Sequence, residues 1–149
     1  MQLEIATPLE RDRGFTLFEL LIVVAIIGAM SMVAIPQLLD AREDYRLTAT
    51  ASSLAGNCAN ARILAVTRNS GIRVTVVNAT TYVLQQKIGG VWTTQESYEL
   101  PPDFTIAATG NVEFQPRGNA TPQTTFTITN PNGRTRSVVV ETSGRAHAQ

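Results

Sequence analysis

The sequence predicts an α+β protein in which one long N-terminal helix packs on a C-terminal antiparallel β-sheet or sandwich domain. Three observations predict this fold. Residues 15–35 form an apolar run that carries a single charge. Residues 37–69 then place apolar side chains at intervals of three or four, as one face of an amphipathic helix requires. Beyond residue 71 the chain is rich in Thr, Val and Ile and is divided by turn residues, which favours short strands.

The apolar run predicts a membrane-spanning helix. The 21 residues from Phe15 to Ile35 contain one charged side chain, Glu19, and as a helix they extend roughly 31 Å, about one hydrocarbon core. Arg11 and Arg13 precede the run, and the positive-inside rule keeps such residues in the cytoplasm. We therefore expect the rest of the chain to lie outside the cytoplasm.

Glu19 needs an explanation, because an ionised acid in a membrane helix costs on the order of 2.5–3.5 kcal/mol near the centre and less near the interface. One interpretation is an interfacial carboxylate that reaches the headgroups. The other is that a cation is supplied later. Cleavage after Gly14 would leave a free amino group on Phe15, one helical turn or roughly 6 Å before Glu19. That amine could pair with Glu19 of the same chain or of a neighbouring chain.

The helix is expected to continue from Gln37 to about Asn69, where Asn-Ser-Gly ends it. Pro36 cannot donate a backbone hydrogen bond and crowds the preceding turn, so we expect a bend or a local loosening there. Cys58, the only cysteine, excludes an internal disulfide and is expected to be a small buried residue. It belongs to the apolar face, whose positions are Leu47, Ala51, Leu54, Cys58, Ala61 and Ala65.

Six strands are predicted after the helix. Gly89 and Gly90 fit a two-residue hairpin loop between the second and third strands. Two prolines in Leu100–Phe104 interrupt the pattern, since proline cannot sit inside a central strand. The predicted strands are residues 72–77, 82–88, 91–94, 111–115, 124–129 and 136–141.

Composition favours a non-enzymatic protein without a metal or cofactor. Basic and acidic residues balance at 12 each, so any charge-driven function must be local. The only histidine, His147, lies near the end of the chain, where we expect fraying. A histidine-based metal site or hydrolase triad is therefore not expected. Glu96, Glu99 and Asp103 surround the proline-rich stretch without a second chemical group, and we interpret them as surface acids.

The N-terminal residues carry a resemblance to a known family. The segment RGFTLFELLIVVAIIG, from Arg13 to Gly28, resembles the class III leader and N-terminal helix of type IV pilins and type II secretion pseudopilins. The resemblance implies that a prepilin peptidase cuts after Gly14 on the cytoplasmic side and methylates the new N-terminal Phe15. It also implies that Glu19 is the assembly glutamate, which meets the N-terminal amine of an adjacent subunit, and that Pro36 kinks the helix.

The C-terminal half resembles the GspH/FimT group of that family. In this group a Phe-x-Pro-x-Gly segment, a hairpin and a closing Gly-Arg recur. The resemblance divides the chain into a leader (residues 1–14), a transmembrane helix (15–36), its amphipathic continuation (37–69) and a β-rich pilin-like domain (70–149). The residues that carry it are Phe114, Pro116, Gly118, Gly133, Gly144 and Arg145.

The two resemblances imply a minor pilin or pseudopilin, a structural subunit that initiates, caps or decorates a type IV pilus or a type II secretion pseudopilus. The implied partners are other pilins or pseudopilins through the N-terminal helices, the prepilin peptidase and the inner-membrane assembly platform. Before assembly the chain would be a single-pass protein of the inner membrane, held in the lipid bilayer with its domain in the periplasm. The sequence does not choose between pilus and pseudopilus.

DNA binding is the alternative function. Residues 117–149 carry a net charge of +3, and some members of the group are minor pilins implicated in DNA uptake that use basic residues near the C-terminal turn. The other interpretation is that these basic residues form a solvated face. The choice between DNA binding and a solvated face stays open. The candidate DNA-binding residues are Arg117, Arg134, Arg136 and Arg145.

Overall fold

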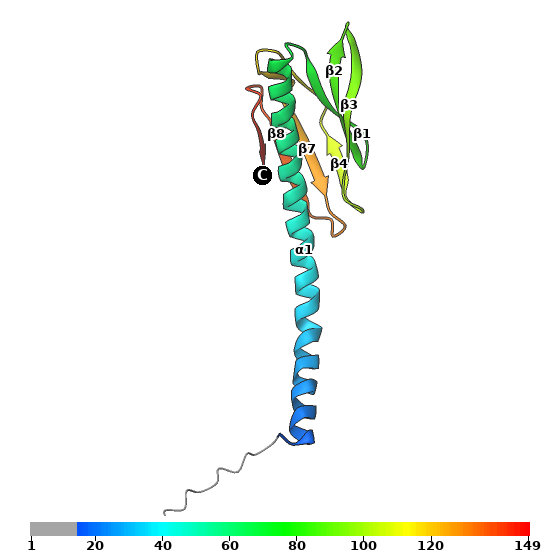
Figure 1. Ribbon diagram of the computed structural model, residues 1–149, viewed down its shortest axis with the longest axis vertical. Helices are drawn as coiled ribbons and strands as arrows, with labels where there is room; N and C mark the ends of the chain where they lie inside the picture. The colour runs from blue at the N-terminus through cyan, green and yellow to red at the C-terminus, as the bar shows by residue number, and fades with distance from the viewer. Residues whose placement is uncertain (1–14) are drawn as a thin grey trace, which may run out of the picture. The chain divides into compact units, whose positions relative to one another are not determined.

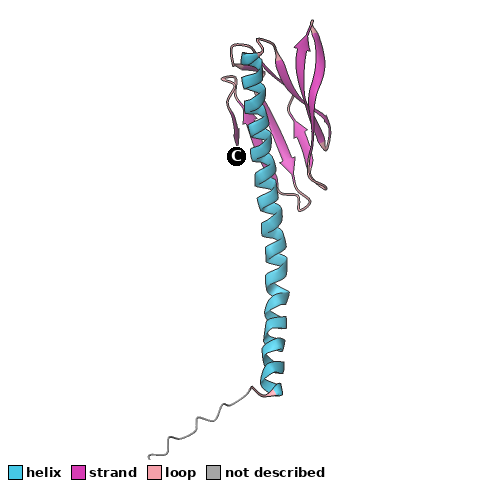
Figure 2. Ribbon diagram, viewed as in Figure 1, coloured by secondary structure: helices cyan, strands magenta, loops and turns pink. Residues whose placement is uncertain are grey.

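The computed structural model describes residues 15–149, in which one α-helix is followed by nine β-strands. Helix α1 (Leu17–Thr67) comes first, and all strands follow it (Figure 2). The chain divides into two compact units. The first ends at Leu39 and the second runs from Asp40 to Gln149. The second part of α1 therefore belongs to the same unit as the strands.

The first unit contains the apolar part of α1. This stretch is long and apolar enough to cross a membrane by length and composition. Its large apolar side chains from Leu17 to Met32 are exposed to between 42% and 80%, which an isolated water-soluble helix does not tolerate over such a length. Ser31 satisfies its hydroxyl inside the helix, by donating to the carbonyl of Ile27 at 2.8 Å. The helix is continuous through Pro36, and the bend expected there stays a prediction.

The second unit contains two antiparallel sheets. The first has the strand order β3-β2-β1-β5-β6 and the second β4-β7-β8-β9. Figure 1 shows β7 and β8 beside the second part of α1. The strands are β1 (Ile72–Asn78), β2 (Thr81–Ile88), β3 (Val91–Glu99), β4 (Thr105–Ala108), β5 (Val112–Phe114), β6 (Ala120–Thr121), β7 (Thr124–Thr129), β8 (Thr135–Val140) and β9 (Ala146–Ala148).

The core of the second unit is one cluster shared by α1 and both sheets. All six predicted helix positions lie in it and are at most 2% exposed. Phe104, Phe114 and Phe126 are fully buried, and burial of each contributes about 1.5–3 kcal/mol. Strand β7 alternates buried and half-buried residues, as a strand with one face on a core does. The predicted α+β fold, a long helix packed on antiparallel sheets, is confirmed.

The helix ends where the sequence predicts. Asn69 has a positive φ of 47°, the left-handed conformation that commonly follows a helix. The amide of Asn69 donates to the carbonyl of Val66 at 3.3 Å, and that of Ser70 donates to Ala65 at 3.2 Å. These two bonds satisfy the last carbonyls of α1 in a Schellman motif.

Several strand boundaries differ from the prediction. Strand β3 continues to Glu99 instead of ending at residue 94, because this polar, exposed strand lies at a sheet edge and shows no apolar alternation. Strands β4, β6 and β9 were not predicted, since they have two to four residues each and depend on long-range pairing. Strand β9 places His147 opposite Val139, so the expectation of a frayed C-terminal end is wrong.

The predicted Gly89-Gly90 hairpin is confirmed. Ile88 and Val91 face each other across the loop, and the two glycines have φ values of 57° and 85°. Positive φ at both central residues defines a type I′ turn, whose twist matches that of the flanking strands.

A second pair of glycines brings two loops into contact. Gly118 and Gly144 have φ values of 83° and 79°, a region that favours glycine. A Cβ atom at Gly144 would overlap the carbonyl oxygen of Gly118 and would lie 3.0 Å from Nε of Arg62. The turn that follows β8 can therefore approach the segment that follows β5 this closely only because Gly144 carries no side chain.

We expect Gly144→Ala to destabilise the second unit more than Gly133→Ala. Both glycines have positive φ, at 79° and 76°, so both variants lose about 1–2 kcal/mol from backbone strain. Gly133 faces open space, whereas Gly144→Ala adds a steric overlap that raises its loss to roughly 3 kcal/mol or more. Urea unfolding of residues 40–149, which contain the whole core cluster, measures both values. Equal losses would contradict the close approach.

Candidate functional site

The start of α1 is a helix cap that fixes Glu19 in the first turn. The backbone amide of Glu19 donates to Oγ1 of Thr16 at 3.2 Å, and the amide of Leu20 donates to the Thr16 carbonyl at 3.2 Å. Thr followed three residues later by Glu is the spacing of a capping box. The sequence analysis missed this cap, although the letters TLFE signal it. A carboxylate here also interacts favourably with the helix dipole, by about 0.3–1 kcal/mol.

The predicted processing site lies at the edge of the described residues. Gly14 lies outside them, whereas Phe15 is described and is 82% exposed. Because the cap at Thr16 starts the helix directly after Phe15, the amino group that cleavage would create belongs to the residue just before the capping residue. The roles assigned to Gly14, Phe15 and Glu19 stay predictions.

The four candidate DNA-binding arginines fall into two groups. Arg134 makes an ion pair with Asp44, and Asn132 next to it donates to Asp40 at 3.2 Å. Arg136 lines the same hollow as Arg134 and Asp44, which has a volume of about 390 Å³. One of the four positive charges is therefore balanced by an acid on α1.

The other two arginines lie near the contact of Gly118 and Gly144. Arg117 lines a hollow of about 270 Å³, and Arg145 directly follows Gly144. This hollow, which we call the arginine hollow, is lined by Arg62, Ile63, Val66, Thr67, Arg117 and Gly118.

The separation of the two groups follows from α1. Asp44 and Arg62 lie roughly 27 Å apart along the helix axis at 1.5 Å per residue. Arg117 lines a hollow with residues from the end of the helix, whereas Arg134 pairs with Asp44 near its middle. The predicted arginines therefore do not form one continuous surface, and DNA binding stays a prediction.

Arg62 is the residue of this region that sequence analysis missed as a site residue. It lies among the polar positions between the apolar residues of the helix, and no local pattern predicts its partner. Its Nε donates to the carbonyl of Gly118 at 2.7 Å, across 56 residues of sequence. The bond ties the last turns of α1 to the loop that follows β5 and holds the guanidinium at the wall of the arginine hollow.

A third hollow, of about 340 Å³, lies beside the stacked rings of Tyr82 and Tyr98. Asn57 donates to the Tyr82 hydroxyl at 2.8 Å, and burial raises the pKa of Tyr82. The Tyr98 hydroxyl donates to Glu96, and this hydrogen bond raises the pKa of Tyr98 to about 12. Glu96, Glu99 and Asp103 are exposed, as expected of surface acids.

The metal-ligating side chain types are scattered over the described residues. Among residues 15–149, no group of three or more His, Cys, Asp or Glu side chains is placed to hold a metal ion. The hollows are open surface features lined by helix, strand and loop residues. What the geometry presents is a membrane-length apolar helix followed by a helix-backed pair of sheets. That combination defines a pilin-like subunit.

Comparison with known proteins identifies the family. Residues 10–35 match the family described as "Prokaryotic N-terminal methylation motif", and residues 50–144 match "Type II transport protein GspH". The second match covers more than half of the chain. The protein therefore belongs to the GspH family, in the GspH/FimT group of pilin-like minor pilins and pseudopilins.

Relatives and solved structures agree with this assignment. The pilin-like protein PilA1 of Thermus thermophilus is 31% identical over 155 residues, which cover 92% of this chain and 98% of PilA1. The minor pseudopilin EpsH of the Vibrio cholerae type 2 secretion system has the same fold, with a TM-score of 0.61 at 11% identity over 70% of this chain and 96% of EpsH. The type IV minor pilin FimU of Pseudomonas aeruginosa gives 0.59 at 16% identity over 72% and 90%.

These matches establish a structural subunit. The family and the fold are those of pilin and pseudopilin subunits rather than of known enzymes. The methylation motif and the apolar helix fit a membrane-anchored protein. The similar proteins include both a pseudopilin and a pilin, so the choice between the two filament types stays open.

We expect Cys58 to be unreactive in the folded protein. Its side chain is fully buried, and burial raises the pKa of the thiol to about 12, so little thiolate is present at pH 8. A maleimide or disulfide reagent reaches the thiol only when the chain unfolds. We therefore expect labelling to be at least about a hundredfold slower in native buffer than in urea. Rapid labelling of the native chain would contradict the packing of α1 on the sheets.

Proposed function

We propose that the chain is a minor subunit of a type IV pilus or type II secretion pseudopilus, anchored in the inner membrane with its domain in the periplasm. A prepilin peptidase cuts after Gly14, and the mature chain then joins the filament, which it initiates, caps or decorates. The match of residues 10–35 to the N-terminal methylation motif carries the proposal. The match to the GspH family and the shared fold support it.

Processing changes the charge at the start of α1. Hydrolysis of the Gly14–Phe15 peptide bond leaves a carboxylate on Gly14 and an amine on Phe15. The amine is mostly protonated at neutral pH and remains basic after methylation. In hydrocarbon a paired charge costs less than an isolated one. The carboxylate of Glu19 then has a cation within one turn, in its own chain or at the end of a neighbouring helix.

The Thr16 cap supports this role for Glu19. The Thr16 hydroxyl accepts the Glu19 amide, so the helix begins at a fixed residue and the carboxylate is carried on a formed first turn. Within residues 15–149 the Glu19 side chain makes no ion pair. Its carboxylate is therefore available to an amine that exists only after cleavage, which makes processing a condition for pairing.

The apolar part of α1 is suited to leave the lipid bilayer and pack against other helices in a filament. Helices in a bilayer gain little from the hydrophobic effect when they meet, because lipid tails are as apolar as leucine. Association then depends on packing and polar contacts. Ala25, Gly28 and Ala29 offer small side chains for close approach, and no other part of the described chain lies within 4 Å of a Cβ atom at Gly28.

The intact mass of the purified protein tests processing. We expect a chain that begins at Phe15 and carries one methyl group on its amine. Coexpression with an inactive prepilin peptidase should return the mass of the full chain. A mass that retains residues 1–14 beside an active peptidase would contradict the assignment of Gly14 and Phe15.

Substitution of Glu19 tests assembly. Glu19→Ala and Glu19→Gln both remove the charge, whereas Thr16→Ser keeps the capping hydroxyl and the carboxylate. We expect cleavage to proceed in all three variants. We expect filament incorporation to fall about tenfold or more in the two Glu19 variants, which corresponds to a loss of about 1.4 kcal/mol or more in the free energy of assembly. Quantitative immunoblotting of sheared filaments against membranes measures this ratio. Wild-type incorporation of Glu19→Ala would remove the assembly role.

A further inference from the structure

The arginine hollow combines exposed apolar side chains with two positive charges. Ile63 and Val66 are 60% and 50% exposed within it, and Arg62 and Arg117 stand at its wall. No acidic residue lines it. Exposed aliphatic side chains beside two cations are complementary to a segment that carries carboxylates next to apolar residues.

One wall of the hollow is fixed before any partner arrives. The bond from Arg62 to the Gly118 carbonyl is 2.7 Å long and uses one of the five N–H donors of the guanidinium. The amide of Gly118 also donates to the carbonyl of Gln115 at 2.8 Å. A preorganised arginine loses less conformational freedom on binding than a free one, so it is a better anchor for a carboxylate.

The complementary segment is present in the same chain. The turn from Glu99 to Asp103 reads Glu-Leu-Pro-Pro-Asp, with an acid at each end. Glu99, Pro102 and Asp103 are exposed, and Asp103 has a φ of 68°. We call residues 99–103 the acidic turn.

The acidic turn is rigid. Leu100 at 9% exposure and Phe104 at 0% anchor its two ends in the core. The amide of Leu100 donates to the Thr80 carbonyl at 2.9 Å, and that of Phe104 donates to Pro101 at 3.2 Å. The two prolines restrict the backbone further. A rigid turn with exposed ends loses little conformational entropy when it docks.

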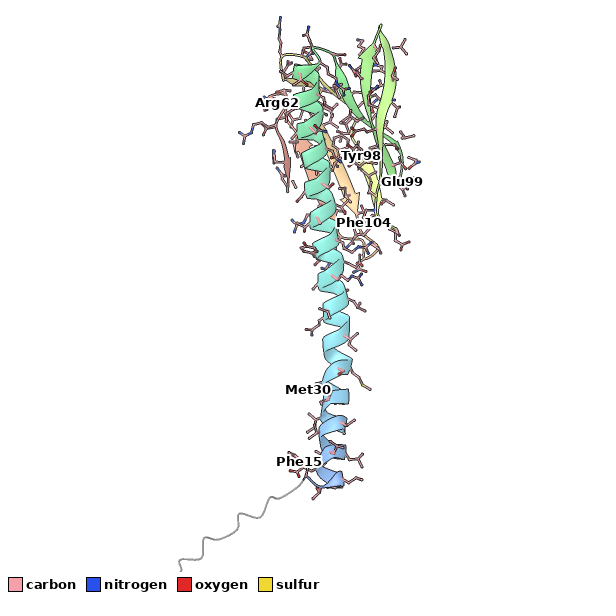
Figure 3. The ribbon with its side chains drawn as sticks, viewed as in Figure 1. Phe15, Met30, Arg62, Tyr98, Glu99 and Phe104 are labelled. Atoms are coloured by element: carbon pink, nitrogen blue, oxygen red, sulfur yellow. The ribbon has the colours of Figure 1, made fainter. Side chains whose placement is uncertain are left out.

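The turn and the hollow lie on opposite flanks of α1. The hollow beside Glu99 is lined by Thr50 and Ser53, and the arginine hollow by Arg62 and Val66. At 100° per residue these two sets fall on either side of the buried stripe. Figure 3 shows Arg62 on one side of the helix and Tyr98 and Glu99 on the other. The turn of one chain therefore cannot reach its own arginine hollow.

We propose that the acidic turn of one copy docks in the arginine hollow of a second copy. Glu99 and Asp103 then meet Arg62 and Arg117, and Pro102 covers Ile63 and Val66. The two surfaces differ, so the contact is head to tail and each copy uses a different surface toward its neighbour, unlike a symmetric dimer. The inference rests on the proposed function and deepens it, because it names a contact between neighbouring domains.

The contact is weak between free domains. Exposed ion pairs contribute little individually, and the aliphatic patch is small. It becomes effective when the membrane helices hold the copies at high local concentration in one orientation. The experiment therefore uses the full chain in inner-membrane vesicles.

Cysteine crosslinking tests the contact. Two full-length chains with different epitope tags, one Val66→Cys and the other Pro102→Cys, are coexpressed and oxidised with copper phenanthroline. The native Cys58 is buried, so it contributes little crosslinking of its own. We expect a disulfide between the two tags, and little between chains of one kind. Val66→Cys paired with Ile88→Cys is the matched control, because Ile88 is also exposed, at 52%, but lies at the hairpin of β2 and β3.

Charge exchange tests the chemistry of the same contact. Arg117→Glu in the Val66→Cys chain should lower the crosslink yield at least about tenfold, since like charges would then face each other. Glu99→Arg in the Pro102→Cys chain should restore it. Arg136→Glu, which also reverses an exposed arginine but outside the hollow, should leave the yield unchanged. Protection of Cys58 from labelling verifies that each variant is folded, and Ile63→Cys replaces Val66→Cys if that variant is not.

Three results would overturn the inference: no crosslink, a crosslink of equal yield in the Ile88 control, or a crosslink yield that Arg117→Glu leaves unchanged. Retention of duplex DNA that is lost in Arg117→Glu, without a crosslink, would assign the hollow to DNA instead. A chain that enters filaments without crosslinking would refute this contact alone. A chain that crosslinks but is neither processed nor incorporated would refute the proposed function alone.

Discussion

The second unit depends on the burial of one stripe of α1 against both sheets. From Leu47 to Ala65 the stripe places two leucines and four small side chains on one face of the helix, and all are at most 2% exposed. The small residues allow the strands to approach closely, and the leucines fill the space between the sheets. Because this stripe fixes the rotation of the helix, it also decides which of its residues face outward. The arginine hollow and the hollow beside Tyr98 lie on its two flanks for that reason.

Local patterns were sufficient to predict the elements that rest on local chemistry. The helix stripe follows from a period of 3.6 residues, the end of α1 from Asn69, and the hairpin from two adjacent glycines. The pairing of short strands was not predictable, because β9 has three residues and is defined only by its partner β8. The site residues show the same limit. Arg62 and Gly118 are 56 residues apart and Arg134 and Asp44 are 90 apart, so no window of sequence contains either contact.

The N-terminal end illustrates how a local motif and a family motif can share residues. Thr16 and Glu19 form the start of a helix by ordinary capping geometry, and the same glutamate is the assembly residue implied by the family resemblance. Capping alone explains why an acid is tolerated at this position, since the first turn of a helix favours negative charge. It does not explain why the acid is followed by a membrane-length apolar run. The proposed function accounts for that combination with a cation, the amine that cleavage would create on Phe15, one residue before the cap.

The balanced charge of the chain conceals a polarised domain. Twelve basic and twelve acidic residues sum to zero, yet the ion pair with Asp44 removes Arg134 from the basic set, while Arg62 and Arg117 share a hollow without an acid. Glu96, Glu99 and Asp103 lie beyond the opposite flank of α1 and are exposed. In the contact proposed above, the acidic turn of one copy faces the arginine hollow of the next, and these opposite charges set the order of the copies, because a reversed neighbour would place like charges together.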